Sequence, residues 1–155
     1  SLLPLLRGET DRMREWALGG IFGRWVQVYD GRRKYARAPV GDNFPLSMWS
    51  NRWSTLPIRT DEPVFPKPDE RAVLDFMPGS TVPVIRQTFQ PGDLVPYWCA
   101  RPRVDEHHLY DIDIDPEENE NRLGGGDERD MMELLHAGLE AVDAPDEQFT
   151  RLGLR

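Results

Sequence analysis

The sequence predicts an α+β domain in which a small antiparallel β-sheet packs against a C-terminal α-helix, with a loop-rich middle. Three observations lead to this prediction. An Asp30-Gly31 pair lies between two strand-like segments, apolar residues recur at helical spacing over 127–142, and many of the 14 prolines fall within 40–104. The length of 155 residues suits a single domain over 1–155 with a hydrophobic core of its own.

The sequence of the N-terminal part, up to residue 38, predicts a β-hairpin. After a short apolar turn, Thr10 or Asp11 is placed to cap a helical turn over 11–16. Residues 18–29 are typical of one strand, and residues 32–38 of its partner. Between them Asp30-Gly31 is a strong signal for a tight hairpin turn, because glycine accepts the positive φ that such turns require.

The middle of the chain gives weaker signals. Residues 45–53 are typical of an extended edge strand or a loop, and residues 81–89 of another strand. Residues 68–77 predict a short helix that starts at Pro68-Asp69 and is stopped by Pro78-Gly79.

Alternating aspartates over 111–115 match the first half of a calcium-binding loop. The sixth position is Pro116 instead of glycine, and the twelfth is Arg122 instead of the closing glutamate. The alternative fits better, because Tyr110 and the isoleucines alternate with the aspartates as in a half-buried strand. We therefore predict a strand over 107–114 that Pro116 ends, followed by a solvated acidic turn.

The final helix has the clearest pattern. Asp127 is placed at its N-cap, and apolar residues recur every three or four positions through 127–142. Pro145 ends it, and the segment that follows is predicted to dock through Phe149 and Leu152.

Composition excludes some classes of function. A net charge of −8 argues against nucleic-acid binding, since phosphates require cations. No apolar run reaches the length of a membrane span, and one cysteine rules out an internal disulfide. The sequence does not indicate a cellular compartment.

Three segments in order carry a resemblance to a known family. They are SLLPLLRGE at 1–9, GIFGRWVQVYDGRRKYARAP at 20–39 and LYDIDIDPEENENRL at 109–123, followed by a helix and APDEQFTRLGL. The series resembles the C-terminal part of the formylglycine-dependent sulfatases of the alkaline phosphatase superfamily. The likeness is weak over about 55–105, and Arg122 alters the family's Asn-Leu pair near Asn121.

The resemblance implies that the chain is the C-terminal domain of a hydrolase of sulfate esters. A formylglycine and a calcium ion would belong to a larger N-terminal catalytic domain of the same polypeptide, which is then the main partner. The start at Ser1 likewise suggests a fragment of a longer protein. Alone, the chain is expected to lack activity, to carry no catalytic residue, metal site or cofactor, and to self-associate.

Four residues are candidates for contact with a substrate: Arg33, Lys34, His107 and His108. Arg33 and Lys34 offer cations for a sulfate or an anionic sugar, although a solvated hairpin end is the alternative. The two histidines are unsuited to one metal ion, because neighbours on a strand point to opposite faces. One of them is placed to reach a substrate pocket in the longer protein.

Cys99 lies in Cys-Ala-Arg-Pro-Arg, which departs from the modification motif C-x-[PA]-x-R because Arg101 stands where Pro or Ala is needed. A small structural thiol is the better interpretation. Trp49, Trp53 and Trp98 either stack on sugars or fill the core of the middle segment. Three other functions stay open: a stand-alone carbohydrate-binding or interaction module, a C-terminal domain of a related phosphonate or phosphodiester hydrolase, and a purely structural domain that buries a large face against a partner.

Overall fold

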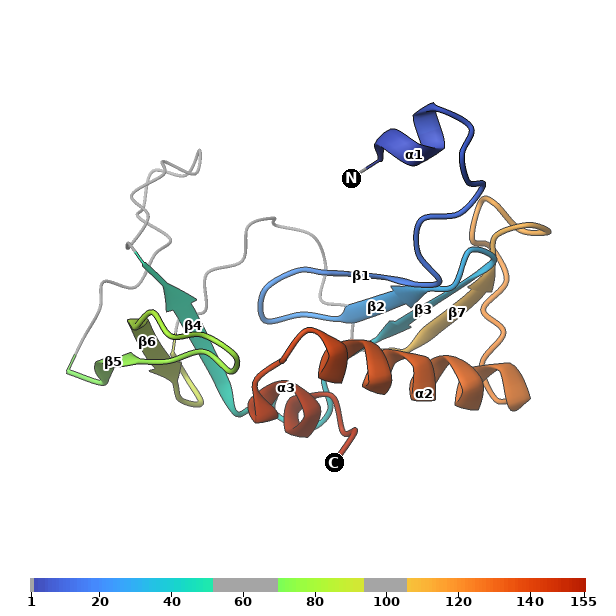
Figure 1. Ribbon diagram of the computed structural model, residues 1–155. Helices are drawn as coiled ribbons and strands as arrows, with labels where there is room; N and C mark the ends of the chain where they lie inside the picture. Colours follow the sequence, from blue (N-terminus) through green and yellow to red (C-terminus); the bar gives the residue numbers. More distant parts are fainter. Residues whose placement is uncertain (1, 52–69, 94–105) are drawn as a thin grey trace, which may run out of the picture.

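The computed structural model describes residues 2–51, 70–93 and 106–155, and these form an α+β fold with two antiparallel sheets and a C-terminal helix (Figure 1). This confirms the predicted fold class. The elements in chain order are α1 (Leu3–Leu6), β1 (Ala17–Gly20), β2 (Val26–Tyr29), β3 (Arg33–Arg37), β4 (Leu46–Ser50), β5 (Ala72–Asp75), β6 (Val84–Phe89), β7 (His108–Asp111), α2 (Gly126–Ala141) and α3 (Asp146–Arg151).

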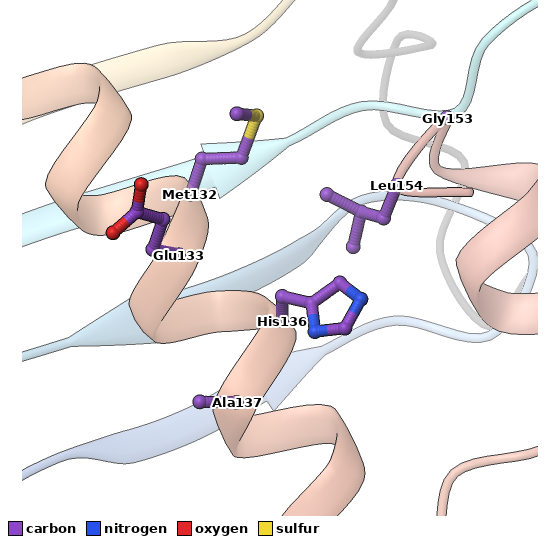
Figure 2. Close-up of a pocket in the computed structure, with 6 residues that line it drawn as sticks. All are labelled: Met132, Glu133, His136, Ala137, Gly153 and Leu154. Atoms are coloured by element: carbon purple, nitrogen blue, oxygen red, sulfur yellow. The ribbon is translucent and has the colours of Figure 1, made fainter.

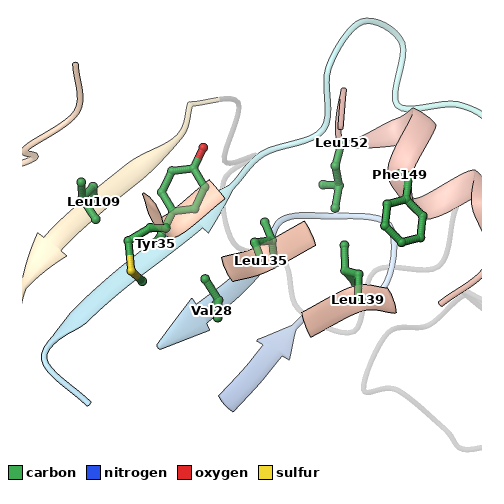
Figure 3. Packing of buried hydrophobic residues seen from close by; sticks show 8 residues of the cluster. Val28, Tyr35, Leu109, Leu135, Leu139, Phe149 and Leu152 are labelled. Carbon is green, nitrogen blue, oxygen red and sulfur yellow. The ribbon is translucent and has the colours of Figure 1, made fainter. Parts of the chain in front are cut away.

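The larger sheet has four strands in the order β1-β2-β3-β7, and α2 lies across one of its faces (Figure 1). In register, Val28 faces Tyr35, and Tyr35 faces Leu109. Their side chains meet the buried face of α2, as predicted for this helix (Figure 3). The buried cluster consists of Val28, Tyr35, Leu109, Met131, Leu135, Leu139, Phe149 and Leu152.

The predicted hairpin at Asp30-Gly31 is confirmed and joins β2 to β3. Asp30 Oδ1 accepts hydrogen bonds from the backbone N–H groups of Arg32 (2.9 Å) and Arg33 (2.6 Å). Gly31 has a φ of 103°, which a side chain would disfavour. The turn thus fixes the register of β3 against β2, and so determines on which face of the sheet each β3 side chain lies.

The prediction of one strand over 18–29 is wrong, because this segment is itself a hairpin of β1 and β2. The chain reverses at Gly23, whose φ is 67°, and the Arg24 N–H donates to the Ile21 carbonyl at 2.9 Å. A glycine inside an apolar run can mark a turn, because it accepts the left-handed conformation. The alternation of apolar and polar residues does not reveal such a turn.

The prediction of a helical turn over 11–16 is also wrong, since the segment is irregular. Thr10 Oγ1 does accept a backbone N–H, that of Arg12, but in a local turn and not at a helix start. The Arg12 guanidinium binds the carbonyls of Arg14, Glu15 and Asp30. These bonds hold the segment against the β2–β3 turn.

The second sheet has three strands in the order β4-β6-β5. Strands β4 and β6 fulfil the predictions for 45–53 and 81–89, and β4 is an edge strand. The predicted helix over 68–77 is wrong, because residues 72–75 pair with β6 as β5. Pairing with a neighbouring strand outweighs the weak helical pattern of this short segment, and Pro78-Gly79 turns the chain between the two strands.

Two further boundaries differ from prediction. Strand β7 ends at Asp111, before Pro116, because the Asp111 carbonyl accepts the N–H groups of Ile114 and Asp115 and closes a turn. Ile114, predicted to be half-buried, is 66% exposed. Helix α2 is capped at Gly125, so Asp127 lies in its first turn, where an acidic side chain favours the helix dipole.

The C-terminal segment docks as predicted, with Phe149 and Leu152 buried in the core. Two buried arginines hold it. Arg37 donates to the carbonyls of Leu152 (2.6 Å) and Gly153 (3.0 Å). Arg151, only 1% exposed, donates to the Arg24 carbonyl (2.7 Å) and to Asn43 Oδ1 (3.0 Å), so α3 is tied to the β1–β2 turn and to the loop before β4.

A buried carboxylate joins α3 to the three-stranded sheet. Glu147 accepts hydrogen bonds from Ser47 (2.8 Å) and Trp49 (3.3 Å) on β4, and from Arg86 (3.3 Å) on β6. Such charge-assisted bonds are stronger than neutral ones. Helix α3 therefore contacts the larger sheet through its apolar side chains and the smaller sheet through this glutamate.

We expect Leu135→Ala to lower the free energy of unfolding by about 2–5 kcal/mol, because Leu135 is fully buried between α2 and the sheet. Urea denaturation followed by circular dichroism measures the change. Val142→Ala, at an exposed position just after the same helix, should change it by less than about 0.5 kcal/mol. Equal losses in the two variants would contradict the packing described.

Replacing Arg151 by methionine should lower the free energy of unfolding by about 2–5 kcal/mol, since it leaves the Arg24 carbonyl and Asn43 Oδ1 buried without their donor. The half-exposed Arg155 is the matched control. Arg155→Met loses surface ion pairs and should cost about 1 kcal/mol or less. An Arg151→Met protein as stable as the control would show that the tail docks by its apolar residues alone.

Candidate functional site

The best candidate site lies on the face of the four-stranded sheet opposite α2. Side chains alternate along a strand, so the neighbours of buried Tyr35 and Leu109 point to this second face. We call Lys34, His108, Tyr110 and Glu118 the open-face cluster. The sheet brings Lys34 of β3 directly opposite Tyr110 of β7, and the turn after β7 supplies Glu118.

Lys34 is the centre of this cluster. Its ammonium forms an ion pair with Glu118 and lies 5.8 Å from the centroid of the Tyr110 ring. Tyr29 of β2 faces Lys34 from the other side and is 38% exposed. The cation thus lies near the Tyr110 ring and is balanced by the Glu118 carboxylate, and Tyr29 is its neighbour across the β2–β3 pair.

His108 and Tyr110 form a stacked pair. Their ring centroids are 5.8 Å apart with an interplanar angle of 19°, and the Tyr110 hydroxyl lies 2.9 Å from His108 Nδ1. Burial raises the pKa of Tyr110, and the nearby Glu118 and Asp115 carboxylates raise it further. The phenol therefore stays protonated at neutral pH and can donate to Nδ1, which favours the tautomer with its proton on Nε2.

The other two predicted site residues lie on the core side of the sheet. Arg33 donates to Asp30 (2.9 Å) and to Asp127 of α2 (2.7 Å). Burial alone would lower the pKa of Arg33, but hydrogen bonds to these two carboxylates raise it. Arg33 thus joins the hairpin to the start of α2.

His107 also has a structural environment. Its Nδ1 accepts the Ala38 N–H at 3.1 Å, and its ring lies edge-on to Tyr35. Burial lowers the pKa of His107, and the charge of Arg37 lowers it further, so the ring is neutral at pH 7. Of the four predicted residues, the sheet therefore brings together Lys34 and His108 and separates them from Arg33 and His107.

The acidic run 111–120 is more than a solvated surface. The Asp111 side chain is 5% exposed and pairs with Arg32 (2.5 Å) and Arg122 (3.4 Å). The hydrogen bond from Arg32 lowers the pKa of Asp111. Asp115 accepts the backbone N–H groups of Glu120 (2.8 Å) and Asn119 (3.1 Å), which shapes the turn that carries Glu118.

These contacts assign structural roles to Asp111 and Asp115. Among residues 2–51, 70–93 and 106–155, no three His, Cys, Asp or Glu side chains are grouped as a metal site would need. The predictions for Cys99, Trp53 and Trp98 lie outside the described residues. Trp49 is half-buried at the junction of β4 with α3, where the Arg86 guanidinium stacks at 5.0 Å from its ring.

A pocket of about 290 Å³ lies elsewhere, between α2 and the C-terminal turn (Figure 2). Its lining is mostly apolar, and the His136 ring in it packs edge-on against Phe149 with centroids 5.0 Å apart. None of the predicted site residues contributes to it. The lining residues are Met132, Glu133, His136, Ala137, Gly153 and Leu154.

Sequence analysis did not identify Tyr110 and Glu118 as site residues. The alternating pattern places Tyr110 on the half-buried face, yet its spacing of two from His108 indicates that both side chains share a face. Glu118 meets Lys34 across 84 positions of sequence, and no local pattern predicts such a pair. The arrangement offers a cation, aromatic faces and an imidazole, which suit contact with an anionic or sugar-like ligand.

No protein-family model, curated protein or solved structure matches this chain. In the part of the chain that the structure describes, no helix has the length and apolar character needed to cross a membrane.

Stability should fall in acid as the acidic turn is protonated. Backbone hydrogen bonds from Glu120 and Asn119 lower the pKa of Asp115 in the folded state. Its stabilising effect is therefore complete above the unfolded pKa of about 3.9 and is lost as the pH falls through the lower folded pKa. We expect Asp115→Asn to flatten the dependence of the free energy of unfolding on pH below about 4, measured by urea denaturation at several pH values. Identical slopes for variant and wild type would contradict this role.

Proposed function

We propose that this chain is the C-terminal domain of a sulfatase-like hydrolase, and that its open-face cluster lies at the entrance to the substrate pocket. One observation carries the proposal. The segments that resemble the sulfatases are far apart in sequence, yet DGRRKY and LYD become the adjacent strands β3 and β7. Lys34 and His108, two of the predicted substrate contacts, lie on those strands.

The chemistry of the cluster supports this role. A sulfate ester is an anion, and Lys34 can donate a charge-assisted hydrogen bond to it when the ion pair of Lys34 with Glu118 is broken. Tyr29 and Tyr110 add aromatic faces of the kind that contact sugars and aryl groups. In this proposal the cluster binds and orients substrate, and the upstream domain performs the reaction.

Calcium and formylglycine would supply the electrophilic cation and the nucleophile for attack on sulfur. The described residues do not group the oxygen donors that calcium requires, because Asp111 and Asp115 are engaged by arginines and backbone N–H groups. We therefore derive no catalytic step for this chain. Its own residues contribute packing against the partner domain and substrate contact.

A second function, a carbohydrate-binding module, is favoured by the same aromatic side chains. It differs in needing no upstream catalytic domain. Binding of a neutral sugar by this chain alone, lost on Tyr110→Ala, would favour it. A related phosphonate or phosphodiester hydrolase is distinguished by the substrate that the longer polypeptide turns over.

The decisive experiment is to sequence the gene upstream of Ser1 and express the longer polypeptide. We expect an upstream C-x-[PA]-x-R motif and hydrolysis of an aryl sulfate that the 155-residue chain alone does not catalyse. A reading frame that opens at residue 1 would refute the proposal. Turnover of a phosphodiester with no turnover of the sulfate would favour the related hydrolases.

Variants of the longer enzyme test the cluster separately. His108→Ala and Lys34→Met should raise KM for an anionic substrate several-fold and leave kcat nearly unchanged, since they remove binding and not chemistry. His136→Ala, on α2 at the opposite side of the sheet, is the matched control. An unchanged KM in both cluster variants would place the substrate elsewhere.

A further inference from the structure

Tyr110 contacts two other members of the open-face cluster. Its ring stacks on that of His108 with an interplanar angle of 19°, and its hydroxyl lies 2.9 Å from His108 Nδ1. The Lys34 ammonium lies 5.8 Å from the centroid of the same tyrosine ring. Lys34 is paired directly opposite Tyr110, and His108 precedes Tyr110 by two residues on the same face. The tyrosine is therefore the common neighbour of the cation and the imidazole.

The hydrogen bond between Tyr110 and His108 has two possible directions. Either the phenol donates to an unprotonated Nδ1, or a protonated Nδ1 donates to the phenol oxygen. Burial raises the pKa of Tyr110, and the Glu118 and Asp115 carboxylates raise it further, so the phenol keeps a proton to donate. A phenol is a better donor than acceptor, because its oxygen lone pair is delocalised into the ring. The first direction is therefore favoured, and it leaves the proton of a neutral His108 on Nε2.

His108 Nε2 is then a donor that the cluster itself does not use. Among the described residues, only the Tyr110 hydroxyl forms a hydrogen bond with the His108 ring, and it does so at Nδ1. The ring is half-buried, and Nε2 is not one of the enclosed polar atoms that lack a partner. An N–H group in this position can therefore donate to an oxygen of a ligand.

We propose that Tyr110 is a positioning residue, whose phenol holds His108 in the tautomer with its proton on Nε2 so that this N–H donates to an acceptor oxygen of the anionic substrate. The contact with substrate rests on the proposed function, because it takes the open-face cluster as the place where substrate binds. The tautomer is a property of this chain and needs no ligand. Lys34 can remain paired with Glu118, since the imidazole donor is separate from that ion pair.

Such a donor would act on specificity. A site that donates a hydrogen bond to a ligand oxygen discriminates against analogues without that oxygen, because its N–H is then left without a partner. The donor has to carry its proton on the nitrogen that faces the ligand. A ring that alternated between its two tautomers would present a donor only part of the time.

The tautomer of His108 can be measured by ¹⁵N NMR, because a protonated and an unprotonated ring nitrogen have clearly different chemical shifts. His107 is an internal reference. Its Nδ1 accepts the Ala38 N–H, which can only donate, so neutral His107 carries its proton on Nε2. At about pH 8.5, between the ordinary pKa values of histidine and tyrosine, we expect His108 to show the same pattern as His107. A His108 ring with its proton on Nδ1 would overturn the proposal.

Tyr110→Phe removes the hydroxyl and keeps the ring. We expect His108 to become a mixture of the two tautomers, while the signals of His107 stay unchanged and show that the sheet is intact. Tyr29→Phe is the matched control, because Tyr29 lies on the same face but its hydroxyl donates to the Gly31 carbonyl at 2.7 Å. This control should leave His108 as in the wild type. A His108 tautomer that does not respond to Tyr110→Phe would show that the phenol does not determine it.

In the longer enzyme, replacements of His108 separate its two ring nitrogens. Glutamine can place an amide N–H near the position of Nε2, whereas the shorter asparagine places one near Nδ1. We expect His108→Gln to keep KM for an aryl sulfate close to the wild-type value, and His108→Asn to raise it several-fold, as expected for His108→Ala. Equal losses in all three variants, or a smaller loss with asparagine, would overturn the role of Nε2. A longer polypeptide that does not hydrolyse the sulfate would refute the proposed function, while the NMR result would still decide whether Tyr110 fixes the tautomer.

Discussion

The rest of the structure depends on the hydrogen bonds of the buried Arg151 guanidinium. It binds the β1–β2 turn through the Arg24 carbonyl and the loop before β4 through Asn43, and so fixes α3 between the two sheets. From that position Phe149 completes the core of the larger sheet, and Glu147 accepts donors from the smaller one. Burial makes these bonds stronger than they would be in water, and it also makes their loss expensive. The protein therefore joins its two sheets through one short helix, by buried polar contacts together with the apolar packing of Phe149.

Electrostatic pairing explains how an acidic chain keeps its basic hairpin in place. Arg32, Arg33 and Lys34 are consecutive, yet each meets a different acidic partner: the end of β7, the start of α2, and Glu118 on the open face. Two of these pairs position the sheet against its helix and its following turn. Only the third lies on the face left free for a ligand, and any anion there must compete with a carboxylate already bound.

The sequence predicted those parts of the fold that are specified locally. The spacing of apolar residues in α2 and the Asp30-Gly31 turn depend on near neighbours and were correct. Start signals predict helices over 11–16 and 68–77, and both predictions are wrong. Thr10 accepts a hydrogen bond within a local turn, and residues 72–75 pair with β6 as strand β5. The candidate site shows the same division. His108 and Lys34 were recognisable as residue types, whereas the contact of Lys34 with Glu118 depends on a strand pairing that no short segment encodes.

The docking of the C-terminal segment also has a consequence for when the native contacts can form during synthesis. Residues 145–155 leave the ribosome after both sheets have been synthesised, and domains generally fold as units. Until that segment emerges, the Arg24 carbonyl and Asn43 lack their donor, and the smaller sheet lacks Glu147. We therefore expect the two sheets to be joined only after this segment has emerged, and the exposed apolar side chains of β5 to be accessible to chaperones until then.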